Sequence, residues 1–129
     1  MSEKFTYIGQ NNPIHIENRS SSTKLIIQKF FYIPESQETL KCIVVRLDDH
    51  KQSLDITNNN ILSDIISLIP KIEVNNNLHY FSFGTQEFID ISENLSNVSN
   101  EIILRFTNGT NNDLIDFKYP YSISIILLN

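Results

Sequence analysis

The sequence predicts an all-β protein: an antiparallel two-sheet β-sandwich or jelly roll with at most one short helix. Alanine, the best helix former, is absent, whereas isoleucine, a β-branched residue that packs well in strands, occurs 21 times. The 16 asparagines gather between apolar runs, where turns favour them. Turn signals recur about every eight to twelve residues, a spacing typical of sandwiches and barrels.

The first 22 residues are expected to form an N-terminal arm or edge strand, and residues 23–129 the β-sandwich domain. Two short alternating pieces, 5–8 and 14–16, are separated by a polar stretch that contains Gly and Pro. Residues 23–33 follow as a strong strand with two largely apolar faces. That pattern predicts a central strand, or one that is covered on both sides.

The middle of the chain is expected to hold further strands and the one short helix. Strands are predicted at residues 40–47, 54–57, 72–74, 78–83 and 87–91. Residues 61–69 place apolar side chains at helical spacing, with Asn60 before them and Pro70 after them. This pattern predicts one to two helical turns, with an ordered loop as the alternative.

The clearest strand pair lies near the C-terminal end. Residues 101–107 and 121–128 alternate between apolar and other side chains, and 114–119 is a third candidate strand. Asn108-Gly109 is a strong hairpin signal, although the polar residues after it favour a longer loop. The predicted apolar faces are Ile102, Leu104 and Phe106 in the first strand and Tyr121, Ile123, Ile125 and Leu127 in the last.

Charge and cysteine content argue against several function classes. The net charge is −5 and the ten basic residues are scattered, which disfavours a nucleic-acid surface. Cys42 lies in an apolar run, which is typical of a small buried side chain rather than a nucleophile. No charged-then-apolar leader and no apolar run near 18 residues occur, so we expect no membrane association and an intracellular origin.

No residue pattern predicts a catalytic, cofactor-binding or metal site. His15, His50 and His79 lie in separate segments without metal-ligand spacing. Asp48 and Asp113 lie in predicted turns without the spacing of a calcium loop, so we expect them to be solvated. Phosphate-binding and nucleophile-elbow motifs are absent from the sequence. We therefore expect a protein that is not an enzyme and holds no cofactor.

Two aromatic runs supply the candidate partner-contact residues: Phe30 and Tyr32 in one strand, and Tyr80 and Phe81 in another. Each run places rings on both faces of its strand. Either one face is core and the N-terminal arm covers the other, or the second face is an apolar patch for a protein partner. The outer faces of a sandwich prefer polar residues, so strands with two apolar faces favour the patch.

Over roughly residues 23–128 the chain resembles small single jelly-roll or β-sandwich virion proteins of large DNA viruses and related virus-like elements. The resemblance rests on KLIIQKF at 24–30, IILRFTNG at 102–109 and SISIIL at 122–127. It implies a minor capsid or capsid-associated subunit without catalytic residues, which forms homo-oligomers or binds capsid proteins through edge strands and apolar surface. It also implies a location in the virion, and in the host cytoplasm during assembly. The Asn-rich composition agrees with some of these viruses and equally with any AT-rich genome.

A second hypothesis is a small binding module of the lectin or carbohydrate-binding type. Such a module would stack a ligand on exposed aromatic side chains, for which Tyr7, Tyr80 and Tyr121 are candidates. The chain contains no Trp, the usual sugar-stacking residue, which weighs against this hypothesis.

Overall fold

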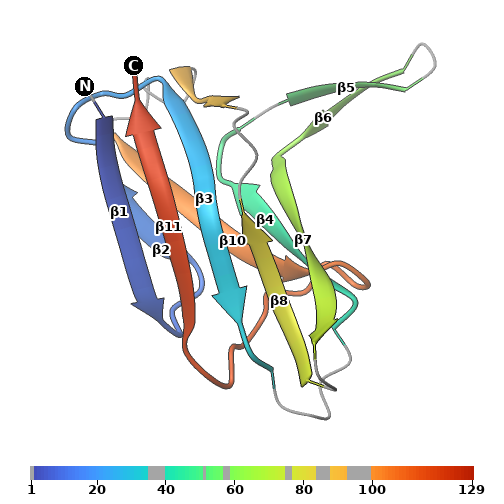
Figure 1. Cartoon of the computed structure of the whole chain (residues 1–129). Helices are drawn as coiled ribbons and strands as arrows, with labels where there is room; N and C mark the ends of the chain where they lie inside the picture. The colour runs from blue at the N-terminus through green and yellow to red at the C-terminus, as the bar shows by residue number, and fades with distance from the viewer. Residues whose placement is uncertain are drawn as a thin grey trace.

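The residues that the structure describes form eleven β-strands, paired antiparallel, and no α-helix (Figure 1). The computed structural model describes residues 2–34, 40–50, 52–56, 59–74, 77–83, 88–92 and 100–129. The strands are β1 (Ser2–Gly9), β2 (Ile14–Glu17), β3 (Lys24–Tyr32), β4 (Cys42–Leu47), β5 (Gln52–Ile56), β6 (Asn59–Ser63), β7 (Ile65–Val74), β8 (Asn77–Phe83), β9 (Ile89–Asp90), β10 (Glu101–Asn108) and β11 (Tyr121–Leu128). The predicted all-β, antiparallel class is confirmed.

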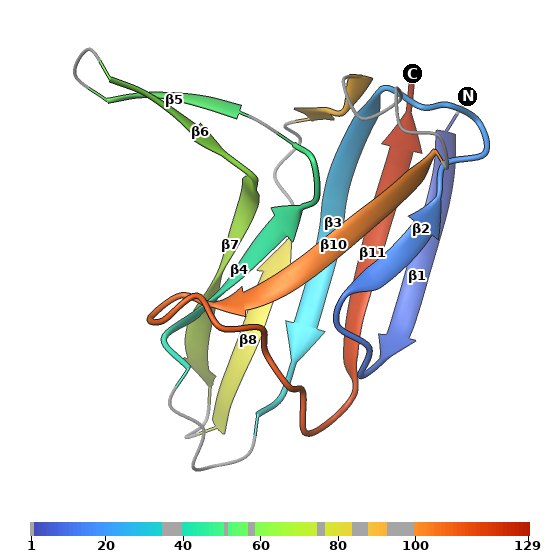
Figure 2. The ribbon, with the colours of Figure 1, turned by 180° about the vertical axis from the view of Figure 1, so that it is seen from behind.

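Nine of these strands belong to one sheet that curls back on itself. Its order is β1-β11-β3-β8-β7-β4-β10-β2, with β9 paired to β3. Because the sheet curls, β10 and β2 at one end lie across from β11 and β1 at the other (Figure 2). Strands β5 and β6 pair with each other as a separate hairpin, which projects from the body of the molecule (Figure 1).

The long strands pair in a nested order. The first pairs with the last, and the pairs β2·β10, β3·β8 and β4·β7 lie inside that outermost pair. Additional ladders β11·β3 and β10·β4 join these pairs side by side, and the β7·β8 hairpin connects the two halves of the sheet. The two ends of the chain therefore lie together, with Ser2 opposite Leu128 (Figure 1).

One hydrophobic core fills the inside of the curl. The apolar faces predicted for β10 and β11 are confirmed, because all seven of their named side chains are buried. Aromatic rings pack at the centre of this core, with centroid separations between 4.3 and 5.8 Å. These rings belong to Phe30, Phe106, Phe117 and Tyr121.

A β-bulge explains why residues 23–33 looked apolar on both faces. In the ladder with β11, Lys29 lies opposite Ser124 but Ile27 lies opposite Ile125, so Gln28 is an extra residue on β3. A one-residue shift moves the following side chains to the other face of the sheet. The buried positions accordingly change from odd to even numbers along β3: Leu25 and Ile27 before the bulge, Phe30 and Tyr32 after it. These four buried residues belong to one core face, whereas Ile26 and Phe31 remain on the outer face.

The helix predicted at residues 61–69 is wrong, because these residues end β6 and begin β7. Strand β7 pairs with β4 on one side and β8 on the other, which supplies the backbone hydrogen bonds that a helix would make internally. A bulge at Ile66 shifts the register between β4 and β7. Asp64 separates β6 from β7, and the bulge adds one residue to β7. Together they place the apolar residues of 61–69 at intervals that are typical of a helix.

Near the C-terminal end, the connection after β10 is the longer loop that the polar residues favoured. Asn112 adopts a positive φ of 61°, and its backbone N–H donates to Asn108 O at 2.8 Å. The strand predicted at 114–119 is reduced to an isolated bridge between Leu114 and Thr107. Ile115 and Phe117 in this segment nevertheless contribute to the core.

Candidate functional site

Three of the four predicted partner-contact residues are core residues. Phe30, Tyr32 and Tyr80 each have 0% of their surface exposed. The Tyr32 ring packs edge-on against Phe117 with a centroid distance of 4.9 Å. A side chain without exposed surface cannot contact a partner, so this prediction is corrected. The side chain of Phe81 lies outside the part of the structure that is described.

The aromatic residues proposed for sugar stacking are corrected for the same reason. Tyr80 is fully buried and Tyr121 is 1% exposed. Tyr7 is half-buried, and its ring centroid lies 5.5 Å from that of Tyr121. Two of the three candidate tyrosines therefore belong to the core and are unable to stack on a ligand from solvent.

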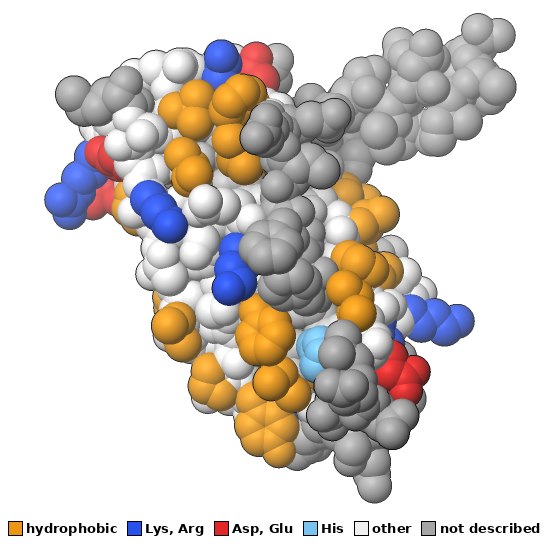
Figure 3. All heavy atoms as spheres, in the orientation of Figure 1, with side chains coloured by type: hydrophobic (Ala, Val, Ile, Leu, Met, Phe, Trp, Pro, Cys, Tyr) orange, Lys and Arg blue, Asp and Glu red, His pale blue; other side chains and the backbone are white. Residues whose placement is uncertain are grey.

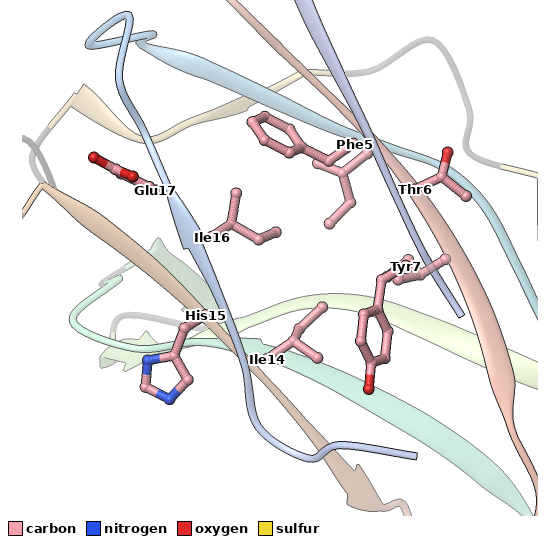
Figure 4. A pocket seen from close by; sticks show the side chains of 9 residues that line it. Phe5, Thr6, Tyr7, Ile14, His15, Ile16 and Glu17 are labelled. Atoms are coloured by element: carbon pink, nitrogen blue, oxygen red, sulfur yellow. The ribbon is translucent and has the colours of Figure 1, made fainter. Parts of the chain in front are cut away.

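The open side of the curled sheet lies between β1 and β2. Within the described strands, β1 pairs only with β11 and β2 only with β10, so each offers a free backbone edge. A cleft of about 220 Å³ lies between them, and we call it the seam cleft. Figure 4 shows Phe5, Tyr7, Ile14 and Ile16 pointing into the space between the two strands. Its lining residues are Phe5, Thr6, Tyr7, Ile14, His15, Ile16, Glu17, Ile123 and Ile125.

Side-chain amides hold the connection between β1 and β2 in place. Asn12 Nδ2 donates to the carbonyl oxygens of Phe106 and Ile115, both at 2.8 Å, and Asn12 Oδ1 accepts from the Phe106 N–H at 3.0 Å. Gln10 Nε2 donates to Phe117 O at 3.0 Å and to Lys118 O at 2.9 Å. Residues 2–17 are thus built into the sheet as two edge strands with an anchored connection.

One end of the seam cleft is closed by two tyrosine hydroxyl groups that share Asn11. Tyr121 donates to Asn11 O at 2.5 Å, and Asn11 N–H donates to the Tyr7 hydroxyl at 3.0 Å. Burial raises the pKa of Tyr121, and the nearby Tyr7 raises it further. The Tyr7 ring lies over Gly9, where an added Cβ would stand 2.4 Å from the Tyr7 hydroxyl oxygen. Glycine is required at position 9 for this close approach.

Charged side chains cover the outer face of β2. His15 Nδ1 lies 2.8 Å from Glu101 Oε1, and Arg19 Nε donates to Glu17 Oε2 at 3.1 Å. Glu17 and Glu101 are directly opposite each other in the ladder between β2 and β10. Charged groups along an edge discourage pairing with another strand. Charged groups therefore protect the β2 edge of the seam cleft.

Exposed apolar side chains occur at positions that the sequence patterning did not single out. Figure 3 shows apolar side chains gathered towards both ends of the face formed by β1, β11, β3 and β8. On this outer face Ile26 lies opposite Ile126, and Lys24 Nζ lies 5.3 Å from the centre of the Phe88 ring. The large hydrophobic residues with the most exposed surface are Ile8, Ile33, Leu68, Phe88, Leu114 and Tyr119.

Asp48, expected to be a solvated turn residue, is an ion-pair partner. Both of its carboxylate oxygens accept hydrogen bonds from Arg105, at 2.7 and 3.0 Å, and this contact raises the pKa of Arg105. Arg105 lies directly opposite Arg46 in the ladder between β10 and β4. Arg46 in turn donates to Asp64 Oδ1 at 2.5 Å. The two carboxylates offset the repulsion of adjacent guanidinium groups, which is a structural role.

The described ranges contain no group of three His, Cys, Asp or Glu side chains placed to hold a metal ion. Among the same residues, no helix has the length and apolar character needed to cross a membrane. No protein-family model matches the sequence, and no curated protein matches it.

Proposed function

We propose that this chain is a non-enzymatic structural protein that assembles through its free strand edges and exposed apolar side chains. The observation that carries the proposal is the seam: two free edges flank an apolar cleft instead of closing on each other. An unpaired edge offers backbone N–H and C=O groups to a strand of another chain. Further burial of the partly exposed, cleft-facing Phe5 and Tyr7 would stabilise such a contact.

The surface area of the chain supports assembly. It exposes 8046 Å², about 1,000 Å² more than area scaling gives for a compact monomer of 14.9 kDa. A stable protein interface takes about 800 Å² from each partner. The surplus has the size of one such interface.

The architecture that we propose is a jelly roll. A jelly roll is an eight-stranded antiparallel hairpin rolled up so that its two halves face each other. The nested pairs β1·β11, β2·β10, β3·β8 and β4·β7 support this topology. In this proposal β1-β11-β3-β8 and β7-β4-β10-β2 form the two facing sheets, and β5, β6 and β9 are additions to them.

On that architecture we propose a minor capsid or capsid-associated component of a virion as the biological setting. Jelly rolls occur in viral capsid proteins and in lectins, so this step rests on likeness of architecture. The burial of Tyr80 and Tyr121 favours the capsid setting over the lectin one, because it removes two of the three tyrosines that were candidates for sugar stacking.

Assembly is tested by multi-angle light scattering on the purified chain from low to high micromolar concentration. We expect an average mass above 14.9 kDa that rises with concentration. Phe5→Lys, which places a charge inside the seam cleft, should keep the protein monomeric, because inward-pointing charges block strand edges. Thr110→Lys, at an exposed polar position in the loop after β10, is the control and should assemble as the wild type does.

Melting curves of both variants establish that each is folded before its mass is compared. A wild-type chain that remains strictly monomeric at high micromolar concentration contradicts the proposed function.

A further inference from the structure

The two edges of the seam are not equally suited to receive a partner. Strand β2 has four residues, and its exposed face carries His15 and Glu17 beside Glu101. Strand β1 has eight residues in unbroken register with β11, without Pro or a bulge. Proteins protect strand edges by short length, charge, Pro or bulges. Strand β1 is long and has neither Pro nor a bulge, and its two charged residues, Glu3 and Lys4, lie near its start. The edge open to pairing is therefore β1.

The sequence of β1 restricts how it can pair with another copy of itself. A two-fold axis perpendicular to the sheet keeps the core faces of both copies on the same side. Two residues that pair across the axis must then point to the same face of the sheet. The axis must therefore lie where one residue faces its own copy, and it cannot lie midway between two neighbouring residues. We name each such axis by the residue that faces its copy. Axes through Phe5 or Thr6 give the longest ladders, because these residues lie at the middle of Ser2–Gly9.

An axis through Thr6 gives the better matched ladder. On the core face it places Phe5 opposite Tyr7 of the other copy, twice by symmetry, and aromatic pairs of this kind stabilise antiparallel ladders. On the outer face it places Thr6 opposite its own copy and Lys4 opposite Ile8, so no like charges meet. An axis through Phe5 gives a single aromatic pair instead.

The position of Gly9 also favours the axis through Thr6. With the axis through Thr6, the Glu3 carboxylate of one copy lies opposite Gly9 of the other. The Tyr7 hydroxyl lies over Gly9 and can donate a hydrogen bond to that carboxylate. An axis through Phe5 would place Glu3 opposite the Tyr7 ring.

We propose that the partner of β1 is the β1 strand of a second copy, paired antiparallel about a two-fold axis through Thr6. This inference rests on the proposed function, since it names the partner at the same seam. The pairing continues β1-β11-β3-β8 across the dimer as one sheet and places the Phe5 and Tyr7 side chains of each copy beside the seam cleft of the other.

Charge substitutions at Ile8 test this register. Ile8 is 72% exposed, so its replacement should leave the fold intact. Ile8→Glu places a carboxylate opposite Lys4 of the second copy, whereas Ile8→Lys places a second ammonium group there. Both remove the same apolar side chain, so only the charge differs. We expect sedimentation equilibrium at low salt to give a dimer dissociation constant roughly tenfold or more higher for Ile8→Lys, and the gap to shrink at 1 M salt.

Disulfide cross-linking tests directly which residues of the two β1 strands lie opposite each other. The variants carry Cys42→Ser, so that the introduced cysteine is the only one in the chain. Thr6→Cys should form a covalent dimer under mild oxidation. Lys4→Cys and Ile8→Cys should each form no covalent dimer alone and should cross-link when mixed. His15→Cys, on the edge strand β2, is the control and should not cross-link.

The outcomes separate the two proposals. A chain that never associates removes both. Association with equal dissociation constants for Ile8→Glu and Ile8→Lys, or cross-links through His15→Cys only, leaves assembly standing and overturns the β1 pairing.

Discussion

At the scale of single residues, side-chain amides hold neighbouring backbone segments in place. Asn18 is 2% exposed, and its side chain both donates to Ser22 O and accepts from Ser22 N–H, at 3.0 and 2.9 Å. The Asn12 side chain likewise donates to Phe106 O and accepts from Phe106 N–H, although the two residues are 94 positions apart. Composition predicts that asparagines lie between strands; Asn12 and Asn111 do, whereas Asn59 and Asn108 lie within β6 and β10. Composition also cannot tell which asparagines are buried, because their partners are set by the tertiary fold.

The paired arginines make Asp48 important for stability. Asp48→Asn removes a two-oxygen contact to Arg105 and leaves that guanidinium facing Arg46. Both ends of the ion pair are partly exposed, so we expect a loss of about 1 kcal/mol in the free energy of unfolding. Asp113→Asn, at an exposed turn position, is the control and should change stability by less than about 0.5 kcal/mol. Equal effects in urea unfolding would show that the Arg105 contact contributes nothing.

Tyr121 should make the protein sensitive to alkaline pH. Its pKa is raised in the folded state, whereas in the unfolded chain it ionises near pH 10. Below that pH the hydroxyl is protonated in both states; above it only the unfolded state loses the proton, so stability falls as pH rises. Between pH 10 and 11 the wild type should lose about 1 kcal/mol more than Tyr121→Phe. Urea unfolding at pH 8, 10 and 11 measures this, and parallel pH profiles would contradict it.

At the scale of elements, periodicity succeeds where a strand is regular and fails at bulges. The strict alternation of β10 and β11 gives their core faces correctly. Strand β3 contains an extra residue at Gln28, and β7 one at Ile66, and each mixes two registers within one apolar run. A bulge is stabilised by the partner strand, so the residues of the bulged strand do not reveal it. This explains both the two-faced prediction for 23–33 and the wrong helix at 61–69.

Deleting the bulge residue tests this explanation. Without Gln28, the run from Leu25 to Tyr32 would alternate strictly and keep its core residues inside. We therefore expect the deletion variant to unfold cooperatively, with its core retained. Deletion of Ile103 in β10, whose ladders contain no bulge, is the matched control: it would move Leu104 and Phe106 to the outer face and turn Arg105 towards the core, and the chain should fail to fold. Thermal unfolding followed by near-ultraviolet circular dichroism distinguishes them; loss of folding in both would count against the bulge account.

At the scale of the whole molecule, the candidate site depends on strand order, which is not a local property. Ser2 pairs with Leu128, at the opposite end of the chain. Only the full order of the sheet places β1 and β2 at its two ends, on either side of an apolar cleft. The sequence indicates an edge strand near the N-terminus and apolar surface for a partner. It misassigns that surface to core aromatics because burial follows from the curl of the sheet.

Hydrogen–deuterium exchange at two protein concentrations tests the central claim most directly. If β1 pairs with another chain, amide exchange in Ser2–Gly9 should slow markedly from low to high micromolar concentration, because its outward N–H groups become hydrogen-bonded. Ile14–Glu17 on β2 provides the comparison within the same sample, and its exchange should change less. Exchange in Ser2–Gly9 that is identical at both concentrations would contradict the account.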